Sequence, residues 1–372
     1  MKIAVFLTYN YSLSTWKNSG TLERELLIYE ELSNHNDVEF VFFSYGNDSD
    51  RVLLKNYKNF DVIPMYKNFK IKNKFIRFIF SLLIPIIFYR NIKNMDIIHQ
   101  HQLLGSWVVL LAKLITKKPL LIRTGYDMYE FSILENVDYL RRSFLYFLTY
   151  FSLKFCNLYT VASKCDKEFL TNRFKKHSNK IVIRSNWIKE INIAKSSVNN
   201  YQVLSVGRLE NQKNYLKLIY EFPENSKYSL KIIGDGSQKE AIKNIIDKNK
   251  LNVVIQNNIK NDSILEIMNK HKFYLSSSLF EGNPKTILEA MSVGSIVLAS
   301  NIKNHQEIIT NQVNGYIVNL NNLDIQNQLN KISSNPEMCK TIANNAKKYV
   351  LEKYNLIKIR ELIFQDYLLL SK

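Results

Sequence analysis

The sequence predicts an α/β protein built from two parallel-sheet domains, and three observations support this fold class. Short apolar segments of strand length alternate with longer segments of helical periodicity along most of the chain. The 372 residues suffice for two domains of ordinary size. Between residues 189 and 200 the apolar signal fades into Lys, Ser and Asn, as is typical of a linker. We therefore expect one domain over residues 1–190 and a second over residues 200–352.

The hydrophobic content, net charge and cysteine count indicate what kind of core and which classes of partner this protein has. Hydrophobic residues make up 46% of the chain, which allows a substantial core, and the net charge is +18. Such a charge is typical of proteins that bind nucleic acid, an anionic membrane or an anionic substrate. The sequence has no zinc-finger, helix-turn-helix or aromatic RNA-binding signature, so we expect no nucleic-acid partner. Three scattered cysteines favour neither a disulfide framework nor a zinc site, and they suit a reducing compartment.

The first domain shows the alternation most regularly. Its apolar segments predict strands over residues 3–7, 38–43, 96–99, 119–123, 158–162 and 180–183, and helices over residues 21–32, 102–114, 139–156 and 164–174. The first strand lacks the long apolar region of a signal peptide. Residues 8–19 are expected to form a polar loop that leads to Gly20, where a backbone without a side chain can approach a ligand. Turn chemistry alone also explains a single glycine here.

Polar residues follow several of these strands, at the edge where α/β sheets bind ligands. His101, Tyr126 and Asp127 are candidates for a binding site at this edge, with a purely structural role as the alternative. The run Asp48-Ser49-Asp50 is formally a D-x-D pair, which binds a metal in one class of sugar transferases. Its neighbours are typical of a turn, so we expect these carboxylates to be solvated and predict no metal site.

Residues 67–93 combine basic and apolar character without any acidic residue. An apolar run over residues 75–89 is interrupted only by Arg77 and Ser81, and it is too short to span a bilayer. One interpretation is peripheral docking on an anionic membrane surface, and the other is a buried helix with solvated basic flanks. The basic residues of this segment are Lys67, Lys70, Lys72, Lys74, Arg77, Arg90 and Lys93.

In the second domain, the candidate site centres on one stretch of sequence, residues 273–300. Residues 273–300 predict a strand, a turn, a helix over residues 284–293 and a second strand over residues 295–299, which together form a parallel crossover unit. We expect Asn283 to cap this helix and Pro284 to be its first residue. Glu281 in the turn and Glu289 on the helix are candidates to bind sugar and ribose hydroxyls. The free amides of residues 282–286 would face a diphosphate. The alternative is that both glutamates are solvated.

A second cluster follows the strand over residues 201–206. Gly207 permits close approach of a ligand, Arg208 can hold phosphate oxygens through two N–H groups, and Lys213 adds a point charge. Two cations aimed at a departing phosphate can do the work of a metal ion. Further strands are expected over residues 230–233, 251–256 and 315–318, and helices over residues 302–310, 323–350 and 354–370.

Three segments resemble one family. EGNPKTILEAMSVGSIVLAS is similar to the E-x7-E signature of retaining glycosyltransferases of family 4, SVGRLENQKN to that family's GR-L-x-x-x-K-N donor-phosphate segment, and NGYIV to a later element. The resemblance is strong over residues 200–320 and weaker over residues 1–190. It implies the GT-B fold, in which two Rossmann-like domains face each other across a cleft. It also implies that residues 353–372 form a helix that packs back on the first domain.

The resemblance also implies roles for particular residues. Arg208 and Lys213 would bind the diphosphate. Glu281 would bind the transferred sugar, and Glu289 would bind the ribose. Gly20 would complete the donor cleft from the first domain. The sequence departs from the family at Tyr126, where a histidine is frequent, and at residues 19–20, where two glycines are usual. The remaining donor-binding candidates are Gly207, Gly282, Asn283, Pro284, Lys285 and Thr286.

The resemblance implies a retaining, metal-independent glycosyltransferase without a cofactor, with His101, Tyr126 and Asp127 on its acceptor side. Together with the basic and apolar segment over residues 67–93, it predicts a cytoplasmic protein that is peripheral on the inner face of the cell membrane. It would use a UDP- or GDP-sugar as co-substrate and a glycan acceptor on a lipid carrier, in the synthesis of capsule, O-antigen or exopolysaccharide. Two alternatives remain. A nucleotide-sugar epimerase of the same fold would form product from the donor alone, and a non-catalytic membrane scaffold would not depend on Glu281.

Overall fold

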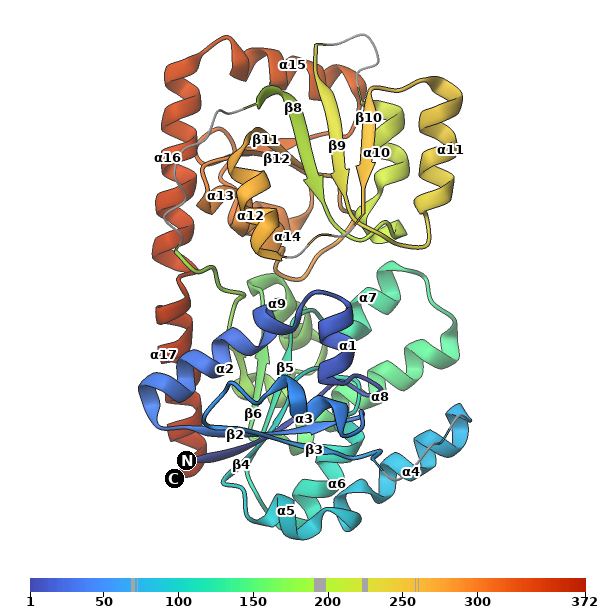
Figure 1. Ribbon diagram of the computed structural model, residues 1–372, viewed down its shortest axis with the longest axis vertical. Helices are drawn as coiled ribbons and strands as arrows, with labels where there is room; N and C mark the ends of the chain where they lie inside the picture. The colour runs from blue at the N-terminus through green and yellow to red at the C-terminus, as the bar shows by residue number, and fades with distance from the viewer. Residues whose placement is uncertain (68–70, 72, 191–198, 223–226, 258, 260) are drawn as a thin grey trace. The chain divides into compact units, whose positions relative to one another are not determined.

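The chain divides into two compact units (Figure 1). In the computed structural model the described residues are 1–67, 71, 73–190, 199–222, 227–257, 259 and 261–372. One unit comprises Met1–Ser185 with Ile357–Lys372, and the other comprises Asn186–Leu356. Most of the expected linker, residues 191–198, lies outside the described residues.

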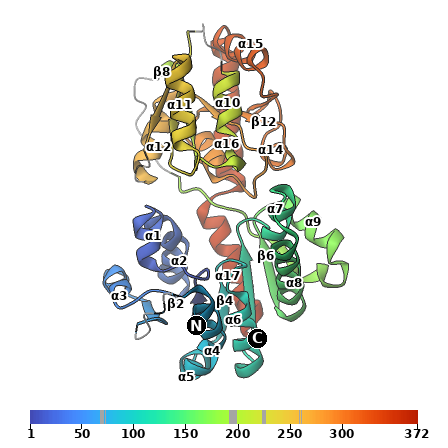
Figure 2. The same cartoon turned by 90° about the vertical axis from the view of Figure 1, so that its right-hand side faces the viewer.

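The N-terminal unit is built on a seven-stranded sheet in the order β3-β2-β1-β4-β5-β6-β7, in which every neighbouring pair is parallel. Helices cover both faces of the sheet (Figure 2), so the interior strand β1 is buried on both sides and is apolar almost throughout. The strands are β1 (Lys2–Phe6), β2 (Glu39–Ser44), β3 (Phe60–Pro64), β4 (Ile97–Gln100), β5 (Leu120–Thr124), β6 (Leu158–Val161) and β7 (Ile181–Ile183).

Several helices of this unit are short. The segment expected to be a polar loop contains α1, because the side chain of Ser12 caps it by accepting a hydrogen bond from the amide of Thr15. Only two residues of α1 are buried, which is too few for a periodic pattern. The helices are α1 (Leu13–Asn18), α2 (Leu22–Asn36), α3 (Ser49–Leu53), α4 (Lys74–Ile87), α5 (Tyr89–Lys93), α6 (Ser106–Thr116), α7 (Met128–Leu134), α8 (Tyr139–Phe155), α9 (Lys164–Arg173), the 3-10 helix η1 (Lys175–Lys180) and α17 (Leu356–Ser371).

The prediction of a solvated turn at residues 48–50 was wrong for Asp50. Its side chain is completely buried and accepts hydrogen bonds from the amides of Leu13 and Ser14 and from the hydroxyls of Ser14 and Ser44. Asp48 is exposed, as predicted, and pairs with Lys67 and Arg51. The sequence could not show this difference, because the donors to Asp50 lie up to 37 residues away along the chain.

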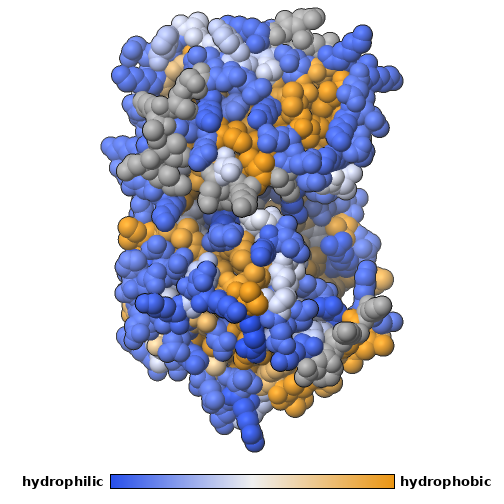
Figure 3. All heavy atoms as spheres, in the orientation of Figure 1, coloured by the Kyte–Doolittle hydropathy of each residue, from blue (hydrophilic) through white to orange (hydrophobic). Residues whose placement is uncertain are grey.

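Helix α4 is neither fully buried nor fully exposed. Ser81, Ile84 and Pro85 are buried, whereas Phe75 is 72% exposed and Ile86 is 62% exposed. Orange surface at the lower right of Figure 3 marks this apolar helix. Within the described part of the chain, no helix is both long enough and apolar enough to cross a bilayer.

Arg77 is half-buried, whereas the other described basic residues of this segment, Lys67, Lys74, Arg90 and Lys93, are exposed. Its guanidinium donates to the carbonyl of Tyr45 at 3.2 Å and lies 4.4 Å from the centroid of the Tyr66 ring, so it anchors α4 rather than forming a free surface charge. Lys70 and Lys72 lie outside the described residues.

The C-terminal unit contains a six-stranded parallel sheet in the order β10-β9-β8-β11-β12-β13. The single helix expected over residues 323–350 is two helices, because Asn335 caps a new helix and Pro336 follows it. The elements are β8 (Asn199–Val206), the 3-10 helix η2 (Asn211–Lys213), α10 (Tyr215–Glu221), β9 (Ser229–Ile233), α11 (Lys239–Asn249), β10 (Val253–Gln256), α12 (Asn261–Asn269), β11 (His271–Ser276), α13 (Lys285–Ser292), β12 (Ile296–Ser300), α14 (Lys303–Ile308), β13 (Tyr316–Val318), α15 (Asn322–Ser333) and α16 (Pro336–Lys353).

Helix α17 packs on the N-terminal unit through polar and aromatic contacts. The guanidinium of Arg184, which follows β7, forms a two-pronged ion pair with Asp366. The Tyr367 hydroxyl lies 2.7 Å from Nδ1 of His99, and the Tyr367 ring is completely buried, 6.3 Å from that of Phe40. The last helix therefore closes one face of the N-terminal sheet.

We expect Tyr367→Ala to destabilise the protein by about 3–5 kcal/mol, because it leaves a cavity at a fully buried aromatic position and removes the partner of His99. Urea titration followed by circular dichroism measures the change. Leu369→Ala on the same helix is the matched control, since Leu369 is 66% exposed. Equal midpoints for the two variants would contradict this account of α17.

Candidate active site

The candidate active site of the C-terminal unit lies where two neighbouring strands end. Strands β8 and β11 are adjacent and parallel, so Gly207 and Arg208 after β8 lie at the same sheet edge as Ser277 and Ser278 after β11. The amide of Leu279 donates to the carbonyl of Gln212 at 2.8 Å, which joins the two connections directly.

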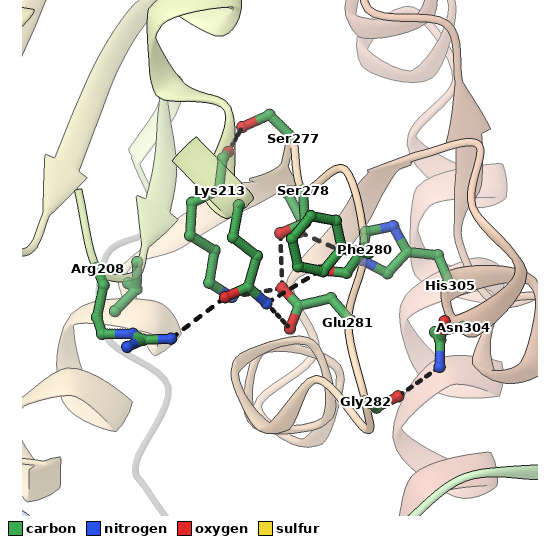
Figure 4. A network of polar contacts seen from close by, with 12 residues as sticks. Arg208, Lys213, Ser277, Ser278, Phe280, Glu281, Gly282, Asn304 and His305 are labelled. Atoms are coloured by element: carbon green, nitrogen blue, oxygen red, sulfur yellow. Dashed lines mark hydrogen bonds and ion pairs between the residues drawn. The ribbon is translucent and has the colours of Figure 1, made fainter. Parts of the chain in front are cut away.

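A buried ion pair forms the centre of this region (Figure 4). The ammonium of Lys213 contacts the carboxylate of Glu281, and their side chains are only 16% and 8% exposed. The Ser278 hydroxyl donates to Oε1 of Glu281 at 2.6 Å, and Nε2 of Gln212 lies 3.4 Å from Oε2. The carboxylate is thus held by a cation and two neutral donors.

Arg208 lies next to this pair. One of its terminal nitrogens donates to Oε1 of Gln212 at 3.2 Å, so Gln212 connects the guanidinium to Glu281. The side chain of Arg208 is exposed, whereas Gln212 is buried. Arg208 and Lys213 were selected from one motif and Glu281 from another, and the three residues therefore belong to one network.

Two glycines allow the loop that carries Arg208 to pack closely against the next loop. A Cβ atom at Gly234 would lie 1.9 Å from the carbonyl oxygen of Gly207, and one at Gly236 would lie 2.5 Å from that of Leu209. The amide of Leu209 donates to the carbonyl of Asp235 at 2.9 Å. The G-x-G turn therefore supports the position of Arg208.

The turn before α13 differs from the prediction. Asn283 does not cap the helix, because its side-chain oxygen accepts from the amide of Asn186 at 3.1 Å and its carbonyl accepts from the Asn186 side chain. Pro284 occupies the cap position, where no side-chain hydrogen bond forms. Amides at the start of α13 are consequently left without a side-chain cap. The carbonyl of Gly282 accepts from the Asn304 side chain at 2.8 Å.

The other candidates of this turn have different environments. Glu289 is buried on α13, so the alternative of a solvated helix residue is excluded. Thr286 is half-buried in the first turn of α13. The ammonium of Lys285 lies 4.7 Å from the centroid of the Trp187 ring.

Electrostatics keep Glu281 ionised. Burial acts to raise its pKa, but the positive charge of Lys213 and the hydrogen bonds from Lys213 and Ser278 outweigh burial and hold the pKa below its usual value. Burial lowers the pKa of His305, which lies behind Glu281, to about 4. His305 is therefore neutral at physiological pH and supports the strand ends through the Ser300 carbonyl, 2.9 Å from its Nδ1.

Sequence reasoning missed Gln212, Ser278 and His305. Gln212 lies between Arg208 and Lys213, and Ser278 lies three residues before Glu281, so proximity in the motifs was an available signal. His305 follows Glu281 by 24 residues on another helix, and no local pattern marks it.

The N-terminal unit contains four of the candidate residues, which are Gly20, His101, Tyr126 and Asp127. His101 is buried, with Nδ1 at 3.0 Å from the Tyr29 hydroxyl and Nε2 at 3.4 Å from Glu25, which favours the structural role. The Tyr126 ring stacks on Phe131 with centroids 4.7 Å apart. Gly20 has a φ of 69°, and the space beside it is open.

Asp127 is buried and caps α7 by accepting from the amide of Glu130 at 2.6 Å. Burial raises its pKa to about 6. Among the described residues, no group of three or more His, Cys, Asp or Glu side chains is arranged to hold a metal ion.

The chain is similar to one family model, to curated relatives and to solved structures. Residues 188–349 match the family model described as Glycosyl transferases group 1. The chain is 28% identical over 173 residues to an Escherichia coli UDP-Gal:alpha-D-GlcNAc-diphosphoundecaprenol alpha-1,3-galactosyltransferase, and the match covers 43% of each chain. The chain thus spans about half the length of the first curated relatives that it matches.

Solved structures show the fold. HepE from Anabaena in complex with UDP is similar with a TM-score of 0.77 at 16% identity, covering 98% of this chain and 99% of HepE. Sucrose-phosphate synthase from Thermosynechococcus elongatus has a TM-score of 0.81 at 14% identity, covering 100% and 99%. The chain has the GT-B fold, and its residues 188–349, less than half of the chain, match the Glycosyl transferases group 1 model.

Proposed function

We propose that the protein is a retaining glycosyltransferase that moves a sugar from a UDP- or GDP-sugar to a glycan acceptor on a lipid carrier. The single observation that carries the proposal is the buried Lys213–Glu281 pair beside the exposed guanidinium of Arg208. This arrangement offers two cations to a leaving diphosphate and a fixed carboxylate to sugar hydroxyls.

The proposed reaction depends on stabilising the negative charge that develops on the departing phosphate. When the bond between the anomeric carbon and the donor phosphate breaks, its electron pair stays on the phosphate oxygen. Arg208 and Lys213 stabilise that charge in place of a metal ion, and the uncapped amides at the start of α13 bind the phosphates. The acceptor hydroxyl forms the new bond from the same face and gives its proton to the departing phosphate.

Glu281 and Glu289 orient the donor in this proposal. Glu281 remains a carboxylate and accepts hydrogen bonds from the transferred sugar, while Glu289 on α13 binds the ribose. A uridine donor is supported by the UDP in the HepE structure, and a diphosphate-linked lipid acceptor by the substrate in the name of the E. coli relative.

We expect Arg208→Ala, Lys213→Ala and Glu281→Gln each to lower kcat/KM by about 10²–10³-fold, because each removes stabilisation of the transition state. Sugar transfer from a radiolabelled nucleotide sugar measures the effect. Lys217→Ala on α10 is the matched control, since Lys217 is exposed. Near-normal rates in all three variants would refute these roles, and product formed from the donor alone would favour an epimerase.

We also expect the product to keep the anomeric configuration of the donor, because departure and attack take place on the same face. Proton NMR of the product, from the coupling constant of its anomeric proton, measures this. An inverted product would require a general base opposite the leaving group and would contradict the proposed mechanism.

We further propose that the protein is peripheral on the inner face of the cell membrane and that α4 contributes to docking. Phe75, Ile76 and Ile86 are exposed on a helix flanked by lysines and arginines. An apolar face with basic flanks binds anionic bilayers through both burial and charge.

We expect the double variant Phe75→Ser with Ile76→Ser to bind liposomes containing phosphatidylglycerol at least 10-fold more weakly than the unaltered protein, because two large apolar side chains no longer enter the bilayer. Liposome flotation measures binding. Val254→Ser, at a position 55% exposed on β10, is the control. Equal flotation of all three proteins would exclude α4 from docking.

A further inference from the structure

A cavity lies among α7, α8 and α9 of the N-terminal unit, and the mechanism proposed above does not use it. Its volume is about 540 Å³, which falls within the range of small-molecule sites. Three helices contribute its walls, which combine aromatic rings with two guanidinium groups. The lining residues are Tyr129, Ile133, Tyr139, Arg142, Ser143, Tyr146, Phe147, Phe169 and Arg173.

The two arginines give the cavity a positive charge. Arg142 donates to the carbonyl of Val137 at 3.0 Å and to the Asn136 side chain at 3.3 Å, whereas its Nε is buried without a hydrogen-bond partner. The guanidinium of Arg173 lies 5.4 Å from the centroid of the Tyr146 ring. Neither arginine forms an ion pair within the described residues, and no acidic residue lines the cavity. Two uncompensated guanidinium groups favour a phosphate as ligand.

The rest of the wall is apolar. The rings of Tyr129 and Tyr146 lie 5.4 Å apart, and Phe169 lies 5.8 Å from Tyr129, so the phosphate would have to carry a group that packs against aromatic rings. A free inorganic phosphate would leave these rings without a partner.

An apolar stripe on α8 continues from the cavity and indicates what that group is. Leu140, Phe144, Phe147 and Phe151 follow one another at the spacing of a helix face and are 80%, 43%, 55% and 42% exposed. Phe147 belongs to both the stripe and the cavity. A hydrocarbon chain that leaves the cavity would cover this stripe, whereas a sugar confined to the cavity would not.

We propose that the cavity binds the phosphate of a lipid phosphate, with Arg142 and Arg173 on the phosphate and the hydrocarbon chain along the α8 stripe. Only the role of the lipid rests on the proposed function: in a glycosyltransferase, the lipid phosphate would be the carrier of the acceptor. Binding of the lipid itself requires neither a donor nor Glu281.

The test measures binding of farnesyl phosphate, below its critical micelle concentration, to the full-length protein by isothermal titration calorimetry. We expect farnesyl phosphate to bind at least 10-fold more tightly than farnesol or inorganic phosphate, because it alone satisfies both the guanidinium groups and the apolar wall. We expect Arg142→Gln and Arg173→Ala to weaken binding about 10-fold each. Arg141→Ala is the matched control, because Arg141 neighbours Arg142 but is exposed and does not line the cavity.

The double variant Phe144→Ser with Phe151→Ser tests the stripe without altering the cavity lining, and it should weaken binding of farnesyl phosphate but not of phosphate. Farnesol binding as tightly as farnesyl phosphate, or equal affinities for Arg173→Ala and Arg141→Ala, would overturn the proposal. Glu281→Gln separates the two hypotheses: it should lose sugar transfer yet bind farnesyl phosphate normally. If the unaltered protein bound the lipid but transferred no sugar, the proposed function would fail and the lipid site would stand.

Discussion

The buried ion pair between Lys213 and Glu281 is the interaction on which the candidate active site depends. Burial of two charges is costly unless each is paired and hydrogen-bonded. Here the hydroxyl of Ser278 and the amide of Gln212 complete the environment of the carboxylate. The pair also joins the connections after β8 and β11, which are 68 residues apart in the chain, so loss of either charge would disturb both. The contact between Lys213 and Glu281 thus determines both the position of the two connections and the charge of the Glu281 carboxylate.

Sequence motifs predicted the members of this site but not their contacts. Arg208, Lys213 and Glu281 could be selected because a glycine, two cations and a glutamate follow predicted strands in recognisable spacings. The pairing of Lys213 with Glu281 depends on β8 and β11 being neighbours in the sheet, which is a property of the tertiary structure. The alternation of strands and helices, in contrast, was readable over most of the chain, because each apolar period is local, although strand β3 and helix α1 were not predicted.

The wrong predictions share a cause. Asn283 has the right chemistry for a helix cap and precedes a proline, yet its side chain bonds to Asn186, nearly a hundred residues away in the chain. Asp50 has turn-forming neighbours, yet it caps buried amides of residues 13 and 14. In each case a polar side chain satisfied distant groups that local propensity does not include.

The ionisation of Glu281 connects stability with recognition. Because Lys213 holds the pKa of Glu281 below its usual value, the carboxylate is an acceptor only and must receive hydrogen bonds. In the proposed function, sugar hydroxyls would supply them without displacing Lys213, since a carboxylate has more lone pairs than the present donors occupy. Lys213 in turn has three N–H groups, so it can keep its contact with Glu281 while it binds a phosphate oxygen. A preformed pair of this kind requires little rearrangement when a donor binds, which is the condition for stabilising charge that develops only during the reaction.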